Sequence, residues 1–486
     1  MSAPPIIHWF RQDLRLADLP ALQAARRREA AVLPVYILDD AAAGEWAPGG
    51  AARWWLHHSL AALQEAIAAD GGELVLCRGD TLQALRTLCR DSGATRVHCT
   101  RRYEPWAAAQ EATLHRALGD AGIAFRRYPG SLLHEPGEVL TQGGDPFRVF
   151  TPFWRACRRR DVPPPLPPGA GTWAPAGRGD RLDDWQLRPR NPDWATGWER
   201  LWQPGEDGAR RRLEDFLADA LAHYAEGRDL PAAARTSRLS PHLHHGELSP
   251  RQVWWRCAEL GSESPELAAS LDKFRAELGW REFSYHLLHF FPEIPEAAFN
   301  ARFSNFPWGD DAAARRAWER GMTGYPIVDA GMRELWQTGH MHNRVRMVVA
   351  SFLCKHLLQH WRHGARWFWD TLVDADLASN SCSWQWVAGS GADAAPYFRI
   401  FNPVTQGEKF DGAGDYVRRW VPELAALPAR YLHHPWDAPA AVLAEAGVRL
   451  GDDYPAPLVE HRAARQAALD AYAQVKGSQR DAAAGR

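Results

Sequence analysis

Short apolar runs alternate with amphipathic stretches through the first quarter of the chain. The apolar runs, which have the length typical of buried parallel strands, lie at residues 6–10, 31–38, 73–77 and 96–100. The amphipathic stretches, which have helical periodicity, lie at residues 51–69, 81–91 and 105–121. This alternation predicts a doubly wound α/β domain with a parallel sheet, which we place at residues 1–130. No GxGxxG motif follows the first strand, so dinucleotide binding is not predicted there.

Proline and glycine dominate the part of the chain that follows. The run DVPPPLPPGAGTWAPAGRGD begins at residue 161 and is too rich in both for regular structure, so we predict an interdomain linker over residues 131–205. The chain then becomes almost entirely helical in pattern, most clearly at residues 206–227, 249–260, 268–291, 312–321, 327–338, 342–363 and 459–475. This predicts a large all-helical domain at residues 206–476 and a frayed tail at 477–486.

Composition limits the functions that the chain can have. The formal net charge is −2, so any contact with nucleic acid needs a local basic patch. The seven cysteines show no CxxC or Cys/His metal spacing, which favours reduced thiols and no metal site. Neither a signal peptide nor an apolar run of about 18 residues occurs, so we expect a cytoplasmic protein without membrane contact.

The most informative segment is DADLASNSCSWQW, from Asp374 to Trp386. Asp374, Asp376 and Asn380 are unusual in a plain core helix, and a solvated loop would not carry Trp384 and Trp386. Polar groups beside large aromatic rings indicate a pocket for a flat, hydrogen-bonding ligand.

Three other segments could carry chemistry, and each also has an ordinary structural interpretation. Hydroxyl groups and an arginine at 236–240 precede Pro241, which suits either an anion site or a capped helix start. Glu277 and Arg281 share a helical face, which suits either a site or a surface ion pair. The helical face that carries Asn343, Arg346 and Met347 likewise suits either a ligand site or an ordinary ion pair. For the tryptophans, the ordinary role is core packing.

These motifs occur together in an order and spacing that resemble the photolyase/cryptochrome family over essentially the whole chain. The matching strings are WFRQDLRLADLPAL, RYEPW, TSRLSPHL, ELGWREFSYHLL, GYPIVDAGMREL, GHMHNRVRM, DADLASN, WQW, DAAPYFRIFNP and TQGEKFD. The resemblance implies an α/β antenna-binding domain, a connector and a helical domain that holds FAD. Within the family, the chain resembles cyclobutane pyrimidine dimer photolyases of bacterial class I or class III. This resemblance implies a monomeric lyase that repairs damaged DNA without an obligate protein partner.

The resemblance assigns roles residue by residue. FAD would be held by Tyr224, Thr236, Ser237, Arg238, Leu239, Ser240, Phe274, Arg281, Asn343, Arg346, Asp374 and Asp376. Asp374 would pair with Arg346 in an ion pair that satisfies a buried charge. Trp384, Trp361 and Trp308 match the chain that re-reduces the flavin under light. The damaged DNA would contact Arg228, Glu277, Trp280, Arg281, Arg344, Met347, Trp386, Arg399 and Lys409, with the pyrimidine dimer flipped out of the duplex.

Asn380 separates the repair enzymes from the photoreceptors in this resemblance. Plant cryptochromes tend to have Asp, and animal ones Cys, where Asn380 would face the flavin N5. An amide is neutral and favours the fully reduced anionic flavin, FADH⁻, the form that repairs DNA. A (6-4) photolyase is disfavoured because its paired histidines are missing where the chain reads Asn343 to Met347. The alternative is a cryptochrome-type blue-light receptor without repair activity, against which the short tail counts.

The antenna pigment is left open between methenyltetrahydrofolate, a deazaflavin and none. Tyr103-Glu104 lacks the Asn-Glu pair of folate-type enzymes, whereas GGAARWWLHH and RYEPW resemble class III photolyases. The resemblance to class III would place the folate against Trp46, Arg53, Trp54, Glu104 and Trp106. His340, where an aromatic is more familiar, and Cys382 are given no role.

Overall fold

The computed structural model describes residues 3–27, 30–394 and 398–484. These form two compact units, each made of segments far apart in the sequence. The first unit comprises Met1–Ala225, Ser237–Pro292 and Val373–Ala378, and the second comprises Glu226–Thr236, Glu293–Leu372 and Ser379–Arg486. The boundary predicted near residue 206 differs from this division, because the first helices beyond it pack with the α/β part.

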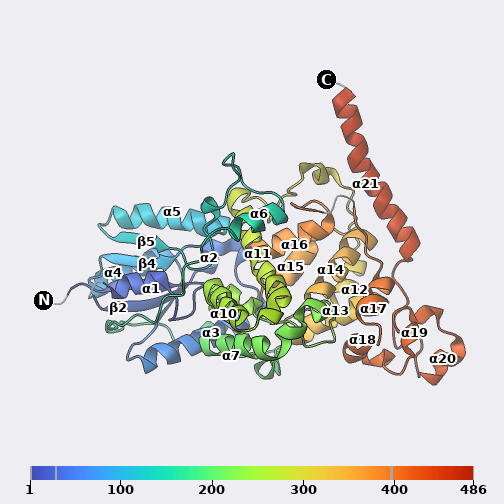
Figure 1. Ribbon diagram of the computed structural model, residues 1–486, viewed down its shortest axis with the longest axis horizontal. Helices are drawn as coiled ribbons and strands as arrows, with labels where there is room; N and C mark the ends of the chain where they lie inside the picture. Colours follow the sequence, from blue (N-terminus) through green and yellow to red (C-terminus); the bar gives the residue numbers. More distant parts are fainter. Residues whose placement is uncertain (1–2, 28–29, 395–397, 485–486) are drawn as a thin grey trace. The chain divides into compact units, whose positions relative to one another are not determined.

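The first unit contains a five-stranded parallel sheet in the order β3-β2-β1-β4-β5 (Figure 1). Its strands are β1 (Ile6–Phe10), β2 (Val32–Leu38), β3 (Val75–Arg78), β4 (Arg96–Thr100) and β5 (Ala124–Tyr128). Every residue of β1 is buried, and Ile6 pairs with Val32 on one side and Arg96 on the other. The central strand therefore has both of its faces covered, as a doubly wound sheet requires.

Alternate residues of β1 enter two separate cores. Ile6 and Phe10 belong to the core that contains side chains of α1 (Pro20–Arg26) and α3 (Gly50–Ala69). Ile7 and Trp9 belong to the core that contains side chains of α4 (Thr81–Ser92) and α5 (Pro105–Gly119). This arrangement confirms the predicted α/β fold class. The strand β5 was not predicted, because its sequence AFRRY is too polar for an apolar run.

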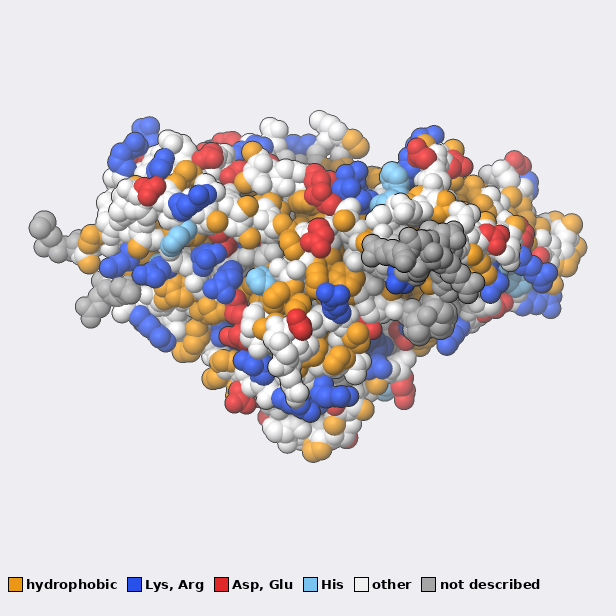
Figure 2. Space-filling model, turned by 90° about the horizontal axis from the view of Figure 1, so that it is seen from above, with side chains coloured by type: hydrophobic (Ala, Val, Ile, Leu, Met, Phe, Trp, Pro, Cys, Tyr) orange, Lys and Arg blue, Asp and Glu red, His pale blue; other side chains and the backbone are white. Residues whose placement is uncertain are grey.

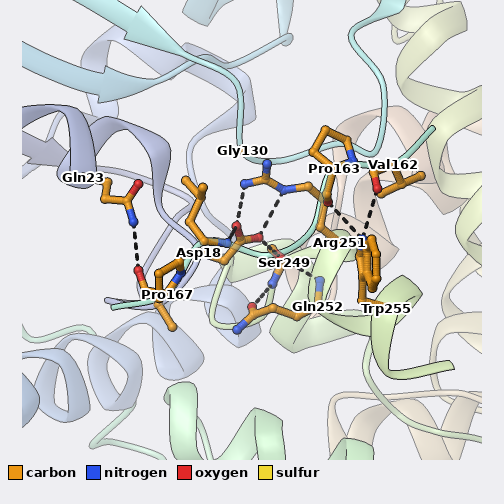
Figure 3. A network of polar contacts seen from close by, with 12 residues as sticks. Asp18, Gln23, Gly130, Val162, Pro163, Pro167, Ser249, Arg251, Gln252 and Trp255 are labelled. Carbon is orange, nitrogen blue, oxygen red and sulfur yellow. Dashed lines mark hydrogen bonds and ion pairs between the residues drawn. The ribbon is translucent and has the colours of Figure 1, made fainter. Parts of the chain in front are cut away.

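The segment predicted as a linker is held in place by hydrogen bonds to other parts of the first unit. Asp18 accepts hydrogen bonds from the backbone N–H of Leu166 at 2.9 Å and from Arg251 Nη2 at 2.6 Å (Figure 3). Trp255 Nε1 donates to the carbonyl oxygens of Val162 and Pro163 at 3.1 and 3.0 Å. The linker also contains the helix α6 (Phe150–Cys157), so residues 131–205 are not uniformly irregular.

Besides the short helix α2 (Asp40–Ala43), further helices of the first unit follow the linker. They are α7 (Glu206–Asp215), a π-helix (Phe216–Ala220), α9 (Ser240–His245), α10 (Pro250–Glu263) and α11 (Ala268–Phe290), with α8 (Tyr224–Gly227) at the boundary of the unit. The turn after β1 packs tightly on the end of α9, since a Cβ atom at Gly246 would lie 2.0 Å from the carbonyl oxygen of Gln12. Gly246 has a φ of +71°, which glycine adopts without strain.

The second unit is helical. Its helices are α12 (Ala312–Glu319), α13 (Pro326–Thr338), α14 (Asn343–Ser351), α15 (Trp361–Thr371), α16 (Leu377–Ala388), α17 (Pro403–Phe410), α18 (Asp415–Trp420), α19 (Ala429–Leu432), α20 (Ala440–Glu445) and α21 (His461–Ala484), of which α16 has its first two residues in the first unit. The single helix predicted over 342–363 is wrong: α14 ends in a π-helix at Phe352–His356, and Leu358 adopts a φ of +50° before α15 begins. Residues 477–484, predicted as a frayed tail, belong to α21.

Glu282 on α11 is a buried carboxyl group that accepts hydrogen bonds from the backbone N–H groups of Leu133 at 2.9 Å and His134 at 3.2 Å. Burial raises the pKa of Glu282 to about 7, although Arg281 and these hydrogen bonds oppose the rise. Between pH 4.5 and 7 the folded protein therefore keeps a proton that the unfolded chain loses. The contribution of this group to stability is complete below pH 4.5 and declines as pH rises through 7.

We therefore expect Glu282→Gln to flatten the pH dependence of the melting temperature over this window. The gain over the natural protein at pH 8 is on the order of 3 kcal/mol, which a chemical denaturation series would measure. Glu263→Gln on α10, at an exposed position, is the matched control and should change nothing. Parallel stability curves for the natural protein and Glu282→Gln would contradict the expectation.

Candidate functional site

Two buried carboxylates lie on the segment that leads into α16. Asp374 and Asp376 are each 8% exposed. Asp374 accepts a hydrogen bond from Ser240 Oγ at 2.5 Å, which joins this segment to the start of α9. Asp376 accepts a hydrogen bond from the hydroxyl of Tyr285 on α11, and its Oδ2 lies 3.5 Å from His244 Nδ1 on α9. The first unit therefore gathers three distant segments around two carboxylates.

The pKa of Asp376 shows that its carboxylate is held ionised. Burial by itself would raise this pKa, but His244, Arg281 and the Tyr285 hydroxyl together hold it well below its usual range. The Arg281 guanidinium lies 4.8 Å over the Tyr285 ring, and its Nη1 donates to the carbonyl oxygen of Ser131 at 2.7 Å. A buried, charged and fixed acceptor of this kind can orient an N–H or O–H group of a ligand.

The residues before α9 combine hydroxyl groups with a strained backbone. Arg238 has a φ of +53°, one of the few positive values for a residue other than glycine among the described residues. Its guanidinium lies 5.8 Å from the Trp202 ring centroid, and Ser237 and Arg238 are half-buried. Leu239 differs from them: it is 2% exposed and packs in a hydrophobic core of the unit.

Two aromatic candidates of the first unit lie in that same core. Phe274 packs against Phe216 and Tyr224, with ring centroids 4.6 and 5.6 Å apart. Phe274 and Tyr224 are 4% and 5% exposed. Packing is thus the role that the structure gives to Phe274, and its predicted contact with a cofactor stays a prediction.

The candidates of the second unit lie on α14 and α16. Asn343 begins α14, and Arg346 Nε donates to the carbonyl oxygen of Met341 at 2.7 Å. Asn380 Nδ2 donates to the carbonyl oxygen of Ala365 on α15 at 2.9 Å. This bond holds the amide group of Asn380 through its nitrogen, and the other polar atom of the amide is a carbonyl oxygen, an acceptor.

The three candidate redox tryptophans all belong to the second unit. Trp308 contacts His360 with ring centroids 5.2 Å apart, and His360 stacks on Trp361 at 5.5 Å. Trp384 is 2% exposed and packs against α15, where a Cβ atom at Gly364 would lie 2.0 Å from its ring. Gly364 lies three residues after Trp361, about one helical turn. The first turn of α15 therefore contains Trp361 itself and the residue that packs against Trp384.

The second unit also groups several of the predicted DNA contacts. Arg344 forms an ion pair with Asp229 at 3.0 Å, and its guanidinium lies 4.4 Å from the Phe410 ring centroid. Lys409 Nζ lies 5.2 Å from that same ring. The other members of the set in this unit are Arg228, Met347, Trp386 and Arg399.

The basic side chains among these predicted contacts differ in exposure. On the face drawn in Figure 2, Lys and Arg side chains lie among acidic ones. Lys409 and Arg399 are exposed, whereas Arg344 is half-buried by its contacts with Asp229 and Phe410. Arg344 and Lys409 share the Phe410 ring, and the local basic patch that the net charge of −2 requires stays a prediction.

The residues predicted to line an antenna site belong to the first unit. Arg53 pairs with Asp40 at 2.9 Å, while Arg102 pairs with Glu104 and stacks over Trp106. Trp54 does not suit the predicted role, because it is 1% exposed and packs against other indole rings in a core. Trp46 is half-buried.

Sequence reasoning missed the side chains that hold the predicted ones in place. His244 and Tyr285 stabilise Asp376. The signal for His244 was the density of histidines in the PHLHH run, and Tyr285 lies in the matching string ELGWREFSYHLL. Trp318 and Phe368 flank Trp384, with ring centroids 6.2 and 5.0 Å away. Among the described residues, no cluster of three or more His, Cys, Asp and Glu side chains could hold a metal ion.

Comparison with known families assigns this arrangement. A family profile described as DNA photolyase matches residues 6–169, and one described as the FAD binding domain of DNA photolyase matches residues 274–474. A curated deoxyribodipyrimidine photo-lyase of Agrobacterium fabrum is 53% identical over 98% of this chain and 99% of its own length. The chain belongs to the photolyase/cryptochrome family. It carries that family's FAD-binding domain, and hydroxyl, carboxylate, amide and arginine groups suit the polar parts of FAD.

Solved structures and plant proteins of the family extend the comparison. The crystal structure of a bacterial class III photolyase from Agrobacterium tumefaciens has a TM-score of 0.94 and 53% identity, and covers 98% of each chain. The cryptochrome of Synechocystis has a TM-score of 0.87 and 30% identity, and covers 97% of this chain and 99% of that one. Cryptochrome-2 of Arabidopsis thaliana is 39% identical over 97% of this chain and 79% of its own length.

We expect Asp376→Asn to lower the melting temperature and the FAD content of this photolyase-family protein. Removing the charge leaves the partly buried Arg281 without this anion and His244 without its charged neighbour, and breaking a buried ion pair costs about 3–5 kcal/mol. Tyr285→Phe is the matched comparison, since it removes one hydrogen bond, worth about 1 kcal/mol, and keeps the carboxylate. Equal losses in the two variants, measured by thermal unfolding and flavin absorbance, would show that the charge of Asp376 is not what matters.

Proposed function

We propose that the protein is a deoxyribodipyrimidine photo-lyase that repairs cyclobutane pyrimidine dimers in DNA under light. The observation that carries the proposal is Asn380, whose Nδ2 donates to the carbonyl oxygen of Ala365 and whose own carbonyl oxygen is an acceptor. Such an oxygen suits the N5–H group of reduced flavin, and a neutral amide is not an acid that would protonate it. The 53% identical relative, a deoxyribodipyrimidine photo-lyase, supports the same function.

The residues proposed to hold FAD are those of the motif correspondence. In the first unit they are Tyr224, Ser237, Arg238, Leu239, Ser240, Phe274, Arg281, Asp374 and Asp376, and in the second Thr236, Asn343 and Arg346. When bound, reduced FAD supplies the electron that light drives into the dimer. The ionised carboxylate of Asp376 would orient an N–H group of the cofactor. Because Asp374 and Asp376 are both buried, water would be excluded from the part of the cofactor that they contact.

The residues proposed for the lesion lie on α11, α14 and α16. Glu277 would hydrogen-bond the damaged base and stabilise charge on it, and Trp280, Met347 and Trp386 would pack on the pyrimidines. Reaching them requires the dimer to leave the duplex stack, which is easiest for a base pair that is already distorted. Arg228, Arg344, Arg399 and Lys409 would neutralise backbone phosphates, so binding should weaken as salt increases.

The finer assignments also stay proposals. Similarity to a class III photolyase favours class III over class I, and with it a methenyltetrahydrofolate antenna near Trp46, Arg53, Glu104 and Trp106. A monomer in the bacterial cytosol is the proposed state. Among the described residues no helix is long and apolar enough to cross a bilayer. A cryptochrome-type receptor is the second candidate, supported by the 39% identical Arabidopsis protein. It is less favoured, because Asn380 and the 53% identical relative both point to repair.

We expect Trp384→Phe to block flavin photoreduction while sparing repair by chemically reduced enzyme. The indole would relay electrons to the flavin during activation, and repair itself would not use it. Blue-light bleaching of oxidised flavin measures the first step, and dimer loss after dithionite treatment measures the second. Trp336→Phe, an exposed position on α13, is the control and should preserve both. Loss of repair in chemically reduced Trp384→Phe would contradict the separation of activation from repair.

Glu277→Ala tests the proposed repair chemistry itself. A hydrogen bond between Glu277 and the charged, reacting base is worth about 1.5–3 kcal/mol, so the repair yield should fall roughly tenfold or more. Affinity for dimer-containing oligonucleotide should fall much less. Glu277→Gln keeps a hydrogen-bonding group and should lie between the two. An unchanged yield in Glu277→Ala would remove this residue from the reaction.

A further inference from the structure

Trp280 is an exposed indole with one face already covered. It lies on α11 and is 39% exposed, among the most exposed large hydrophobic side chains of the described residues. The ring of Phe150 stacks on it with centroids 3.6 Å apart and an interplanar angle of 9°. Phe283 meets the Trp280 ring edge-on at 6.1 Å and 71°. The indole plane is thus set by two neighbouring rings of the first unit.

The position of Phe150 is itself fixed by close packing of α6 against α11. A Cβ atom at Gly279 would lie 2.6 Å from the Trp154 ring, so only glycine lets the two helices approach this closely. Trp154 also meets Trp254 edge-on at 6.0 Å. Phe150 is the first residue of α6, and it is therefore held by the same packing that holds Trp154. Gly279 therefore allows the close packing of α6 on α11, and this packing places the Phe150 ring on Trp280.

A parallel ring on one face changes what an exposed tryptophan can do. An unsupported indole turns about its side-chain bonds and loses that freedom when a base stacks on it. An indole already stacked on a phenyl ring has its plane set before binding, which reduces the ordering cost of recognition. The remaining exposed area of Trp280 offers a flat apolar surface to a pyrimidine, because bases stack well on aromatic rings.

We propose that Phe150 is a positioning residue for lesion recognition, which acts through Trp280 by holding the indole ready for the flipped dimer. The inference rests on the proposed function, in which Trp280 packs on the damaged pyrimidines. Phe150 does not touch the reacting atoms in this account. Its contribution is to binding selectivity for damaged over undamaged DNA, since phosphate contacts elsewhere attract both kinds of DNA equally.

The test compares Phe150→Leu with the natural FAD-loaded protein. Affinities are measured for one oligonucleotide with a single thymine dimer and for the same sequence undamaged. We expect Phe150→Leu to weaken binding of the dimer-containing strand about threefold to tenfold, the range of one aromatic stacking contact. Binding of the undamaged strand and the repair rate at saturating substrate should not change. Phe150→Tyr keeps a stacking ring and should restore natural affinity.

Two controls keep the result interpretable. Phe147→Leu removes a ring from the same aromatic group, but its ring contacts are to Phe153 and His286, so selectivity should be unchanged. In a Trp280→Ala background, Phe150→Leu should have no further effect on the dimer affinity. The double variant measures the coupling between Phe150 and Trp280 even if Phe150→Leu lowers the stability of the fold. Such a loss of stability would occur with Trp280 present or replaced, so it cancels in the comparison.

The inference would be overturned if Phe150→Leu kept natural selectivity, or if it weakened both oligonucleotides equally. An undiminished effect of Phe150→Leu in the Trp280→Ala background would also overturn it, because the action would not run through Trp280. If the natural protein itself bound the two oligonucleotides equally, the proposed function would fail first, and this outcome is distinct from a failure of Phe150 alone.

Discussion

The buried carboxylate of Asp376 is the constraint on which the candidate site of the first unit depends. A charge removed from water is tolerated only when partners replace its hydration, and here the hydroxyl of Tyr285, the imidazole of His244 and the guanidinium of Arg281 do so. These partners come from α9 and α11, while Asp376 lies on a segment about ninety residues further along the chain than Tyr285. Satisfying one charge therefore fixes where three segments meet.

The same requirement explains why the first unit unites the α/β part with helices beyond the linker. The turn after β1 contains Arg15, which is buried and donates to the carbonyl oxygens of Gly246 and Gly130 at 2.8 and 2.9 Å. Asp18 in the same turn bonds Leu166 of the linker and Arg251 of α10. Buried charges with fixed partners thus connect the sheet, the linker and α9–α11 into one compact body.

Much of the architecture could be predicted from the sequence because periodic patterns report local burial. The strands at 6–10 and 96–100 were predicted at their true bounds, since both are short apolar runs. The break between α14 and α15 was not, because the residues around Leu358 keep a helical pattern while the backbone turns at a positive φ. β5 was missed for a related reason: its place at the edge of the sheet allows polar residues.

The candidate site was predictable only through its resemblance to a family. Composition and spacing suggested a pocket at 374–386, and the family motifs supplied the ligand. Neither could find His244, Tyr285 or Phe150, because their roles come from contacts across long sequence distances that no local pattern encodes. The assignment of Trp54 to an antenna site failed for a different reason. Trp54 is 1% exposed in the folded protein, and the sequence alone does not show how deeply a tryptophan is buried.

We infer that light drives this protein to split pyrimidine dimers in DNA. The most direct test incubates the reduced, FAD-loaded protein with a thymine-dimer oligonucleotide in matched light and dark arms. We expect dimers to disappear and intact thymines to return only in the light, while the dark arm shows binding alone. Stable binding without any loss of dimers in the light would contradict it and favour a photoreceptor.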